Sequence, residues 1–398
     1  MREGYKMTEL GEMPENWEVV KFIEVMVLQR GFDLPSISRT PGAYPLIASN
    51  GKIDTHNTFK VAGPIIVTGR SGTIGKVYYE EENSWPLNTT LYVKEIYKND
   101  SKFLYYFLLN FDLKRFSTGT GVPTLNRNIV HTEKVLLPPV YEQQKIAEIL
   151  TTVDDKLEII NTQITQTQEL KKGLMQQLLT KGIGHTKFKD SVLGVIPESW
   201  EVVELGDVTK LQGGFAFKST DASLVGGIRW LKIANVSPNK IIWDDASYLP
   251  LNFGLIYIDY LLKNNDIVIA MTRPILGDKL KIAKVTINDH GSLLNQRVGR
   301  VVVKENVSSN FIYQVLSSIE FVSSLNKEIR GTDPPNISST MFENIKIIIP
   351  PLLEQQNIAE ILNSIDEKLE VLNMKKHSFT DLKKGLMQQL LTGKIRVK

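Results

Sequence analysis

The chain contains no cysteine, which excludes disulfide bonds and thiolate metal sites. It also contains no run of about 18 apolar residues, and its first residues lack the apolar core of a signal peptide. The net charge is only +3 over 398 residues, so the chain as a whole is not a polycation, although a local basic face would be hidden in this average. With 42% hydrophobic and 23% charged residues, we expect a soluble cytoplasmic protein of two or three domains.

Motifs that would carry catalysis are also missing. The glycine-rich segment 69–76 resembles a phosphate loop, but Arg70 stands where a glycine is needed and Val77 replaces the required Ser or Thr. The segment 333–336, Asp-Pro-Pro-Asn, is similar to a signature of amino-group DNA methyltransferases, but Asn336 replaces the aromatic residue that stacks on a flipped base.

Other candidate clusters are better explained by solvated helix faces. The segments Asp154-Asp155-Lys156 and Asp366-Glu367-Lys368 lie in the middle of predicted helices at matching positions. The five histidines form no ligand pair. We find no set of nucleophile, base and metal ligands, so we expect a non-catalytic protein.

What the chain does contain is a duplication. The sequence PPVYEQQKIAEILTTVDDKLEIINTQITQTQELKKGLMQQLLT begins at Pro138, and a near-copy begins at Pro350, with a constant offset of 212. A shorter pair, LGEMPENWEVV at Leu10 and LGVIPESWEVV at Leu193, has an offset of 183, which places 29 extra residues in the second half. The repeats enclose two inserts, 20–137 and 203–349, that we cannot align with each other. A shared frame around two different inserts is suited to holding two different recognition surfaces.

Each long repeat predicts one amphipathic helix of about 40 residues, roughly 60 Å long. Proline pairs open the helices, and Gly182 and Gly393 close them. The apolar seam slips in phase near Thr167 and Phe379. Its predicted members are Ile146, Leu150, Val153, Leu157, Ile160, Ile164, Leu170, Leu174 and Leu178 in the first helix, and Ile358, Leu362, Ile365, Leu369, Leu372, Phe379, Leu382, Leu386 and Leu390 in the second.

A helix of this length cannot bury its seam alone, so the two copies are natural partners. We expect antiparallel packing about a pseudo-two-fold axis, in a pseudo-circular arrangement that brings residue 1 near residue 398. The alternative is that each seam packs only on its own insert. Trp17 and Trp200, at equivalent positions, are expected to begin the core of each domain.

Both inserts indicate an α+β fold of strands followed by one helix. In the first insert we predict strands within 44–54, 63–69, 75–81 and 89–95 and a helix over 101–116; in the second, strands within 228–236, 265–271, 279–286 and 297–304 and a helix over 310–326. The predicted organisation is a first domain over 1–140, a long helix over 141–184, a second domain over 185–351 and a second long helix over 352–398.

The doubled P-P-x-x-E-Q-Q-x-I-A-E-I-L…L-K-K-G-L-M-Q-Q-L-L-T block, with a W-E-V-V segment opening each domain, resembles the specificity subunits of type I restriction-modification systems. The resemblance covers the full chain. It implies that each insert is a target-recognition domain for one half of a bipartite DNA site, and that the helices set the spacer and dock two methyltransferase subunits. It further implies that this chain binds no cofactor, that the methyltransferases bring S-adenosylmethionine, and that restriction subunits bring ATP and Mg.

For DNA contacts, polar and basic residues on loops are the expected readers. The candidates are Arg70, Ser71, Thr73, Lys76, Thr120, Asn126 and Arg127 in the first insert, and Lys218, Arg273, Lys279, Asn295, Gln296, Arg297 and Asn336 in the second.

For the partner subunits, we expect a helix surface whose residues are identical in both copies beyond what the seam requires. The candidates are Gln143, Gln144, Lys171, Lys172, Gln176 and Gln177, with Gln355, Gln356, Lys383, Lys384, Gln388 and Gln389. The competing hypothesis is a structural adaptor that tethers two ligand-binding domains and does not bind DNA.

Overall fold

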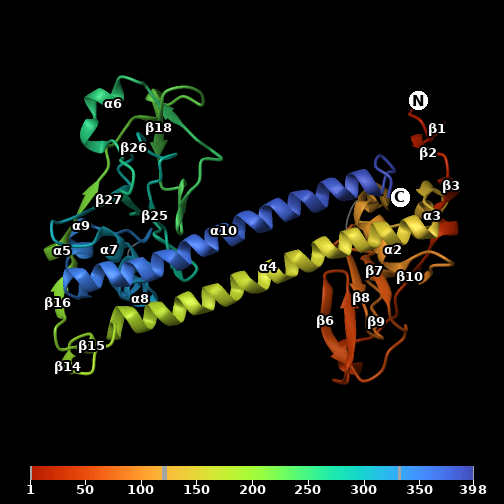
Figure 1. The fold of residues 1–398 in the computed structure, drawn as a ribbon, viewed down its shortest axis with the longest axis horizontal. Coiled ribbons are helices and arrows are strands. Elements are labelled where there is room, and N and C mark those ends of the chain that lie inside the picture. The colour runs from red at the N-terminus through yellow and green to blue at the C-terminus, as the bar shows by residue number, and fades with distance from the viewer. Residues whose placement is uncertain (1, 119–122, 330–332, 398) are drawn as a thin grey trace. The chain divides into compact units, whose positions relative to one another are not determined.

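The chain forms two compact units in the computed structural model, which describes residues 2–118, 123–329 and 333–397. Unit 1 comprises Met1–Gln163 and Leu372–Lys398, and unit 2 comprises Ile164–Val371. The two long helices, α4 (Val140–Lys181) and α10 (Leu352–Leu390), each contribute to both units (Figure 1). Within the described residues, no helix combines the length and apolar character needed to cross a bilayer.

Unit 1 contains the first insert, with mostly short strands. Its elements before α4 are β1 Tyr5–Thr8, β2 Gly11–Pro14, β3 Glu18–Lys21, α1 Phe22–Val25, β4 Val27–Arg30, β5 Tyr44–Ala48, β6 Gly51–His56, β7 Ile65–Gly69, β8 Val77–Glu80, β9 Trp85–Pro86, β10 Thr90–Glu95, α2 Ser101–Asn110, β11 Ser117–Thr118, β12 Thr124–Leu125, α3 Arg127–Thr132 and β13 Lys134–Leu137.

Unit 2 contains the second insert between the two long helices. Its elements are β14 Phe188–Ser191, β15 Gly194–Pro197, β16 Glu201–Glu204, α5 Leu205–Val208, β17 Thr209–Gly213, β18 Ile228–Leu231, β19 Val236–Ser237, β20 Lys240–Ile241, β21 Tyr248–Leu249, α6 Phe253–Ile256, β22 Ile267–Ala270, β23 Ile275–Leu276, β24 Lys279–Leu280, β25 Ile282–Lys284, β26 Leu293–Leu294, β27 Val298–Val303, α7 Ser309–Leu316, α8 Ile319–Glu328, α9 Ser339–Glu343 and β28 Lys346–Ile349.

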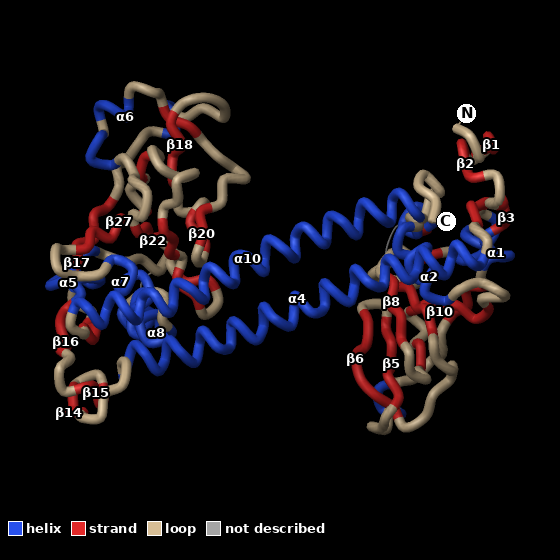
Figure 2. Tube along the Cα trace, in the orientation of Figure 1, coloured by secondary structure: helices blue, strands red, loops and turns tan. Residues whose placement is uncertain are grey.

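The two inserts, which cannot be aligned by sequence, share one sheet topology. The central antiparallel sheet has the order β4-β10-β7-β8 in unit 1 and β17-β27-β22-β25 in unit 2. Figure 2 shows the strands of both inserts in red and the long helices in blue. A parallel pair accompanies each sheet, β5 with β9 and β18 with β26. In each unit, an outer strand before the sheet pairs with the strand that runs into the helix-opening prolines, β3 with β13 and β16 with β28. The predicted α+β class and the predicted strands are confirmed.

The helices of the inserts are shorter than predicted. α2 ends at Asn110, where Phe111 turns to an extended conformation, so the expected helix over 101–116 is wrong after residue 110. A short 3-10 helix, Leu113–Phe116, follows the break. The helix expected over 310–326 is divided into α7 and α8, because the Ser318 side chain accepts from Phe321 N and caps a new helix. α2 and α7 are themselves equivalent, since Asp100 and Ser308 cap them in the same way.

Within each unit, the beginning of one long helix runs antiparallel to the end of the other. In unit 1, Lys383 Nζ of α10 lies 2.6 Å from Asp154 Oδ1 of α4. In unit 2, the equivalent Lys171 lies 2.6 Å from Asp366 Oδ1. Because these ion pairs are the same pair under the 212-residue offset, the predicted antiparallel, pseudo-symmetric pairing is confirmed.

Each long helix also packs on its own insert, so the alternative proposed for the seam describes part of the observed packing. Ile146 and Leu150 belong to the same core cluster as Phe103 of the first insert and Leu390 of α10. Ile358 and Leu362 make the corresponding cluster in unit 2.

The predicted seam fails at Leu170 and Leu382, which are exposed. Beyond the phase slip near Thr167, the inward positions are taken by Lys171 and Lys383, which form the ion pairs with Asp366 and Asp154. The seam therefore includes charged residues that a search for apolar periodicity does not find.

In unit 1, a hydrogen-bonded cluster of Trp17, Glu142 and Arg396, which we call the clasp, joins the two terminal segments of the chain. The pseudo-circular prediction requires such a contact. Trp17 Nε1 donates to Glu142 Oε2 over 2.8 Å, and Arg396 NH2 lies 2.7 Å from Glu142 Oε1. The Arg2 guanidinium donates to Lys394 O, so the two terminal segments are in contact. Trp17 is buried at the centre of this arrangement.

Unit 2 repeats the tryptophan–glutamate contact of the clasp with a different cation. Trp200 Nε1 donates to Glu354 Oε2 over 2.8 Å, and His185 Nε2 lies 2.8 Å from Glu354 Oε1 in place of the arginine. Gly182 ends α4 beside this clasp with φ +67°, and a Cβ there would lie 2.6 Å from the Trp200 ring. The helix end is therefore restricted to glycine both by its left-handed conformation and by space.

The clasp predicts an acid-sensitive unit 1. Burial raises the pKa of Glu142, but hydrogen bonds from Trp17, Arg396 and other neighbours outweigh this effect, and the net pKa lies below the usual 4.5. A depressed carboxylate pKa stabilises the fold above the unfolded-state pKa, and this stability is lost as the pH falls through the folded-state value. We expect Glu142→Gln to remove this contribution, so that urea denaturation shows a stability gap to the wild type at neutral pH. The gap should narrow as the pH falls below 4.5; a gap that is constant across this range would contradict the assignment.

Candidate nucleic-acid interface

Three loop segments of the first insert meet at the end of the central sheet. They are the turn after β7, residues 70–73, the turn between β9 and β10, residues 87–89, and residues 124–125 of β12; we call them the first cradle. Arg70 N donates to Thr89 O over 2.9 Å, and Leu125 N donates to Arg70 O over 2.7 Å. Ser71 forms a β-bridge with Thr124.

The second insert contains an equivalent second cradle, made of residues 271–273, 295–297 and 336–337. Met271 N donates to Arg297 O over 2.9 Å, and Ile337 N donates to Met271 O over 2.7 Å. Thr272 forms a β-bridge with Asn336, and its hydroxyl lies 2.9 Å from Asn336 Oδ1. The same backbone bonds with the same lengths identify the two cradles as one structure built twice.

The second cradle opens into a cavity of about 460 Å³. Its lining includes Gln296, Arg297 and Asn336, three of the residues predicted from the sequence to contact DNA. All three side chains are exposed. Each of these residue types can form a bidentate hydrogen-bonded pair with a base edge in the major groove.

The two cradles present different side chains on the same backbone. Arg70, Ser71 and Thr89 of the first correspond to Met271, Thr272 and Arg297 of the second. Gly72 corresponds to Arg273, and both have a positive φ, +84° and +48°. The left-handed region disfavours a side chain, so the arginine there indicates a residue retained at some conformational cost.

The remaining predicted residues of the first insert lie at or beside the first cradle. The Thr73 hydroxyl donates to Ser49 O, and Lys76 is exposed just before β8. The Asn126 side chain accepts from Asn128 N and caps α3, and Arg127 NH1 donates to Leu28 O over 3.3 Å, so both also have local structural partners. Thr120 lies outside the described residues.

The remaining predicted residues of the second insert are less closely grouped. Arg273 is exposed, and its backbone N donates to Pro335 O at the edge of the cavity. Asn295 Oδ1 accepts from Arg297 N and stabilises the turn. Lys218 is exposed but is not among the cavity residues, and Lys279 lines a different pocket beside α4.

The structure adds cradle residues that sequence reasoning missed. Asn88 and Thr89 occupy the places of Gln296 and Arg297. Thr124, bridged to Ser71, occupies the place of Asn336, which is bridged to Thr272. The available signal was the repeated Gly-Phe at 31–32 and 214–215. Each Phe backbone N donates to the last residue of the strand that precedes this turn, Pro86 of β9 or Leu294 of β26.

A partly buried histidine, His131, lies behind the first cradle. Burial, together with the charge of Arg127, lowers the pKa of His131. Its Nε2 accepts from Leu28 N over 3.0 Å, which requires the unprotonated nitrogen. Arg127, the charged neighbour of this histidine, is exposed beside the first cradle.

Within residues 2–118, 123–329 and 333–397, no group of three or more acidic or histidine side chains could hold a metal ion. Asp154, one of two adjacent carboxylates in the middle of α4, instead accepts from the Tyr106 hydroxyl over 2.8 Å and pairs with Lys383. Its role is therefore structural.

The twelve helix residues expected at a partner surface divide into three groups. The expectation of an exposed surface is wrong for Gln143 and Gln355, which are buried because their side chains bond Asp100 N or Ser308 N and the proline carbonyls before each helix. Lys171 and Lys383 are half-buried in ion pairs. The other eight are exposed: Gln144, Lys172, Gln176, Gln177, Gln356, Lys384, Gln388 and Gln389.

Comparison with known proteins agrees with the doubled architecture. A family model described as the type I restriction modification DNA specificity domain matches twice, over residues 14–169 and 197–378. The MjaVIII type I restriction enzyme specificity subunit of Methanocaldococcus jannaschii is 36% identical, over 100% of this chain and 97% of the relative. The putative MjaX specificity subunit of the same organism is 30% identical over equal shares. The chain therefore belongs to the type I restriction-modification specificity subunit family.

Solved structures show the same fold. The type I restriction-modification S subunit of M. genitalium superimposes with a TM-score of 0.65, over 98% of this chain and 99% of that chain, at 15% sequence identity. A chain from a structure titled for complex assembly and conformational transition of the type I R-M system gives a TM-score of 0.53 at 13% identity, over 96% and 99% of the two chains.

Proposed function

We propose that this chain is the DNA-reading subunit of a type I restriction-modification complex, and that each cradle reads one half of a bipartite, asymmetric site. The observation that supports this most directly is the pair of cradles: one backbone structure, built twice, with different side chains. Two readers with the same backbone would approach DNA in the same way, while unlike side chains would select unlike sequences.

The chemistry of the cradles suits a duplex. Exposed Arg297, Gln296 and Asn336 offer donors and acceptors for guanine and adenine edges, whereas Ser71 and Thr124 suit phosphate or sugar contacts. The long helices then fix the spacing between the two half-sites, as dimer geometry does in other DNA readers.

We further propose that the helices dock two methyltransferase subunits through a second apolar stripe. Tyr141, Ile159 and Leu170 on α4 are 51%, 48% and 53% exposed. Their spacings of 18 and 11 residues equal about five and three helical turns, so they share one face, opposite the buried seam residues Ile146 and Leu150.

The same stripe recurs on α10. Leu353, Val371 and Leu382 are the equivalents under the 212-residue offset, and they are 71%, 44% and 48% exposed. A solvated helix face is normally polar, so an apolar stripe present in both copies indicates a partner that binds twice. The exposed glutamines and lysines identical in both copies would form the polar rim of that interface.

In this account, the methyltransferases supply S-adenosylmethionine and adenine methylation in the cytoplasm, and restriction subunits with ATP and Mg supply cleavage. This chain supplies the target sequence to both.

A binding experiment separates DNA reading from the adaptor hypothesis. A DNA reader loses affinity steeply as salt rises and prefers one sequence, because phosphate contacts release counterions and base contacts select. We expect both properties for the complex with methyltransferase; binding that is weak at low salt and indifferent to sequence would favour the adaptor.

The stripe predicts the effect of single charges on docking. We expect Ile159→Asp and Val371→Asp each to remove one of the two methyltransferase copies, because a carboxylate would be buried without a partner. Native mass spectrometry of the mixture should then show one copy per chain for each single variant and none for the double variant. The Thr162→Asp variant, at an exposed polar position of α4 one turn from Ile159, is the matched control and should retain two. Two copies in every variant would contradict docking through the stripe.

A further inference from the structure

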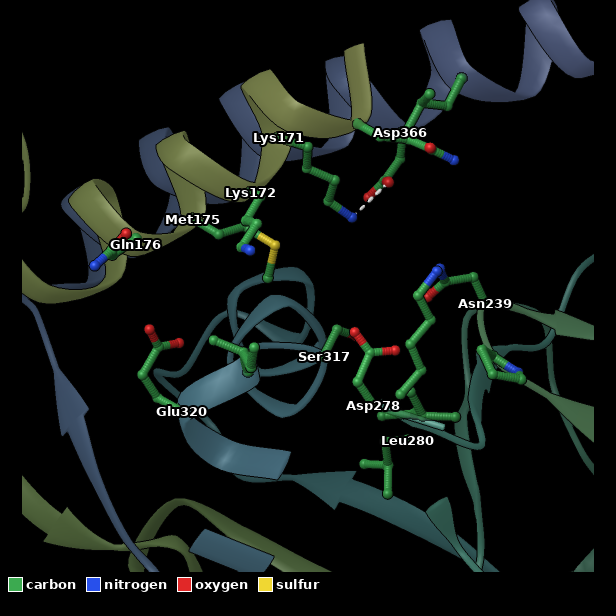
Figure 3. A pocket seen from close by; sticks show the side chains of 16 residues that line it. Lys171, Lys172, Met175, Gln176, Asn239, Asp278, Leu280, Ser317, Glu320 and Asp366 are labelled. Carbon is green, nitrogen blue, oxygen red and sulfur yellow. Dashed lines mark hydrogen bonds and ion pairs between the residues drawn. The ribbon is translucent and has the colours of Figure 1, made fainter. Parts of the chain in front are cut away.

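Unit 2 contains a pocket of about 490 Å³ between the long helices and the second insert (Figure 3). α4 contributes Lys171, Lys172, Met175 and Gln176 to its wall, and α10 contributes Asp366 and Leu369. The facing wall comes from the insert, with Asn239, Asp278, Leu280, Ser317 and Glu320 (Figure 3).

The pocket has an apolar interior and a polar rim. Leu280 and Ile282 are buried in its floor, and Met175 is half-buried. The Lys171–Asp366 ion pair crosses its wall with both charges neutralised (Figure 3). Lys172 and Gln176 are exposed, so the pocket can be reached from the helix surface.

The charges around the pocket argue against an anionic occupant. Three lysines line it, at 171, 172 and 279, and three carboxylates balance them, at 278, 320 and 366. A phosphate or a DNA backbone would meet as much repulsion as attraction here. An uncharged, largely apolar group fits the lining better.

Unit 1 shows what fills the equivalent space. Because Asp100 and Ser308 cap α2 and α7 in the same way, Tyr106 is equivalent to Gln314 and Leu109 is equivalent to Ser317. In unit 1, Leu109 packs on the core, and the buried Tyr106 ring lies under Lys383 Nζ, 5.4 Å from the ring centroid. The Tyr106 hydroxyl donates to Asp154 over 2.8 Å.

Unit 2 has the same lysine and aspartate but smaller side chains from the insert. Gln314 Nε2 donates to Asp366 over 2.9 Å in place of the tyrosine hydroxyl, and Ser317 lines the pocket where unit 1 has a leucine. The helix wall is thus built for an apolar or aromatic neighbour that the second insert does not supply.

We infer that the pocket is an anchor site for one apolar, preferably aromatic, side chain of the methyltransferase subunit that docks on unit 2. This inference rests on the proposed docking function. Continuity supports it, because Lys172 and Gln176 at the rim belong to the exposed helix residues that are identical in both copies. An aromatic side chain entering a desolvated pocket is the usual anchor of a protein interface.

Filling the pocket tests the inference. Ser317→Leu installs the residue that unit 1 carries at the equivalent position, so the fold should tolerate it. Ser323→Leu makes the same chemical change at an exposed position of α8 that is not part of the pocket lining and is the matched control. Gln176→Trp, on the exposed helix face, blocks the rim without touching the core of the insert.

Stepwise affinities for the purified methyltransferase subunit, measured by titration with native mass spectrometry, give the readout. We expect Ser317→Leu and Gln176→Trp each to weaken one of the two binding steps at least tenfold, which corresponds to about 1.4 kcal/mol. Ser323→Leu should leave both steps unchanged.

The outcomes distinguish the inference from the function on which it rests. Two unchanged steps in both pocket variants would overturn the anchor site while leaving docking intact. A loss of DNA affinity with unchanged methyltransferase binding would mean that DNA is the occupant, and would also overturn it. Failure of the wild type to bind any methyltransferase would overturn the docking proposal and the anchor site together.

Discussion

Arg297→Ala is expected to relax one base position in one half of the target site and to leave the other half unchanged. Arg297 is exposed at the second cradle, and its own backbone belongs to the turn that Asn295 stabilises, so truncating the side chain removes a donor and preserves the turn. A bidentate arginine–guanine contact accounts for about 1–3 kcal/mol of discrimination. Affinity for the cognate sequence should therefore fall about fivefold to 150-fold. Competition with single-base variants shows which position is relaxed.

The matched control is Arg70→Ala in the first cradle. Arg70 occupies the position of Met271 in the other cradle, with the same backbone contacts. Removing the Arg70 side chain should therefore affect only the half-site that the first cradle reads. A uniform loss of affinity across all sequences in Arg297→Ala would identify a phosphate contact instead of a base reader. A change at both half-sites from one substitution would contradict independent reading.

Trp200→Ala is expected to destabilise unit 2 by about 3–5 kcal/mol, the usual cost of removing a buried tryptophan. The ring is fully buried, and its Nε1 is a donor to the Glu354 carboxylate that joins the second domain to the start of α10. The substitution therefore leaves a cavity and also removes a hydrogen bond from a carboxylate that is mostly shielded from water.

Hydrogen exchange followed by mass spectrometry shows where this loss occurs. Amides of β17, β22 and β27 should exchange at least about 100-fold faster in Trp200→Ala, because their protection reports the stability of unit 2. Trp17→Ala should produce the same effect in β4, β7 and β10 of unit 1 and spare unit 2. Equal acceleration in both units from either substitution would show that the chain unfolds as one block.

The two long helices and the start of each domain could be predicted because their sequences occur twice in the chain. Identity at a fixed offset identified the long helices, and the matching tryptophans identified the domain cores. The pairing of the helices followed from the need to bury two equal seams. Its antiparallel sense followed because each insert must return the chain to the start of the next helix. The exposed Leu170 and Leu382 could not be predicted, because ion pairs of Lys171 and Lys383 take the inward positions and periodicity counts only apolar residues.

The common fold of the inserts was hidden by changes of register. The offset between equivalent residues is 183 near Phe32, 208 along α2 and 212 from Thr124 onward. The second insert therefore contains extra residues at several places, and no ungapped alignment covers a whole insert. Much of the extra length falls between β18 and β22, the segment that contains α6. The buried caps made by Gln143 and Gln355 were misjudged because identity between copies indicates either a partner or a shared structural role.

The most direct measurement is the methylation pattern of a methylation-free host that carries this gene with its neighbouring methyltransferase gene. The control host carries the methyltransferase gene alone. We expect a new split motif, with methyladenine in both halves, that appears only when this chain is present. In the Arg297→Ala variant, one half of that motif should accept more than one base at one position. An identical methylation pattern with and without this chain, in cells where the complex forms, would contradict the claim that it reads the sequence.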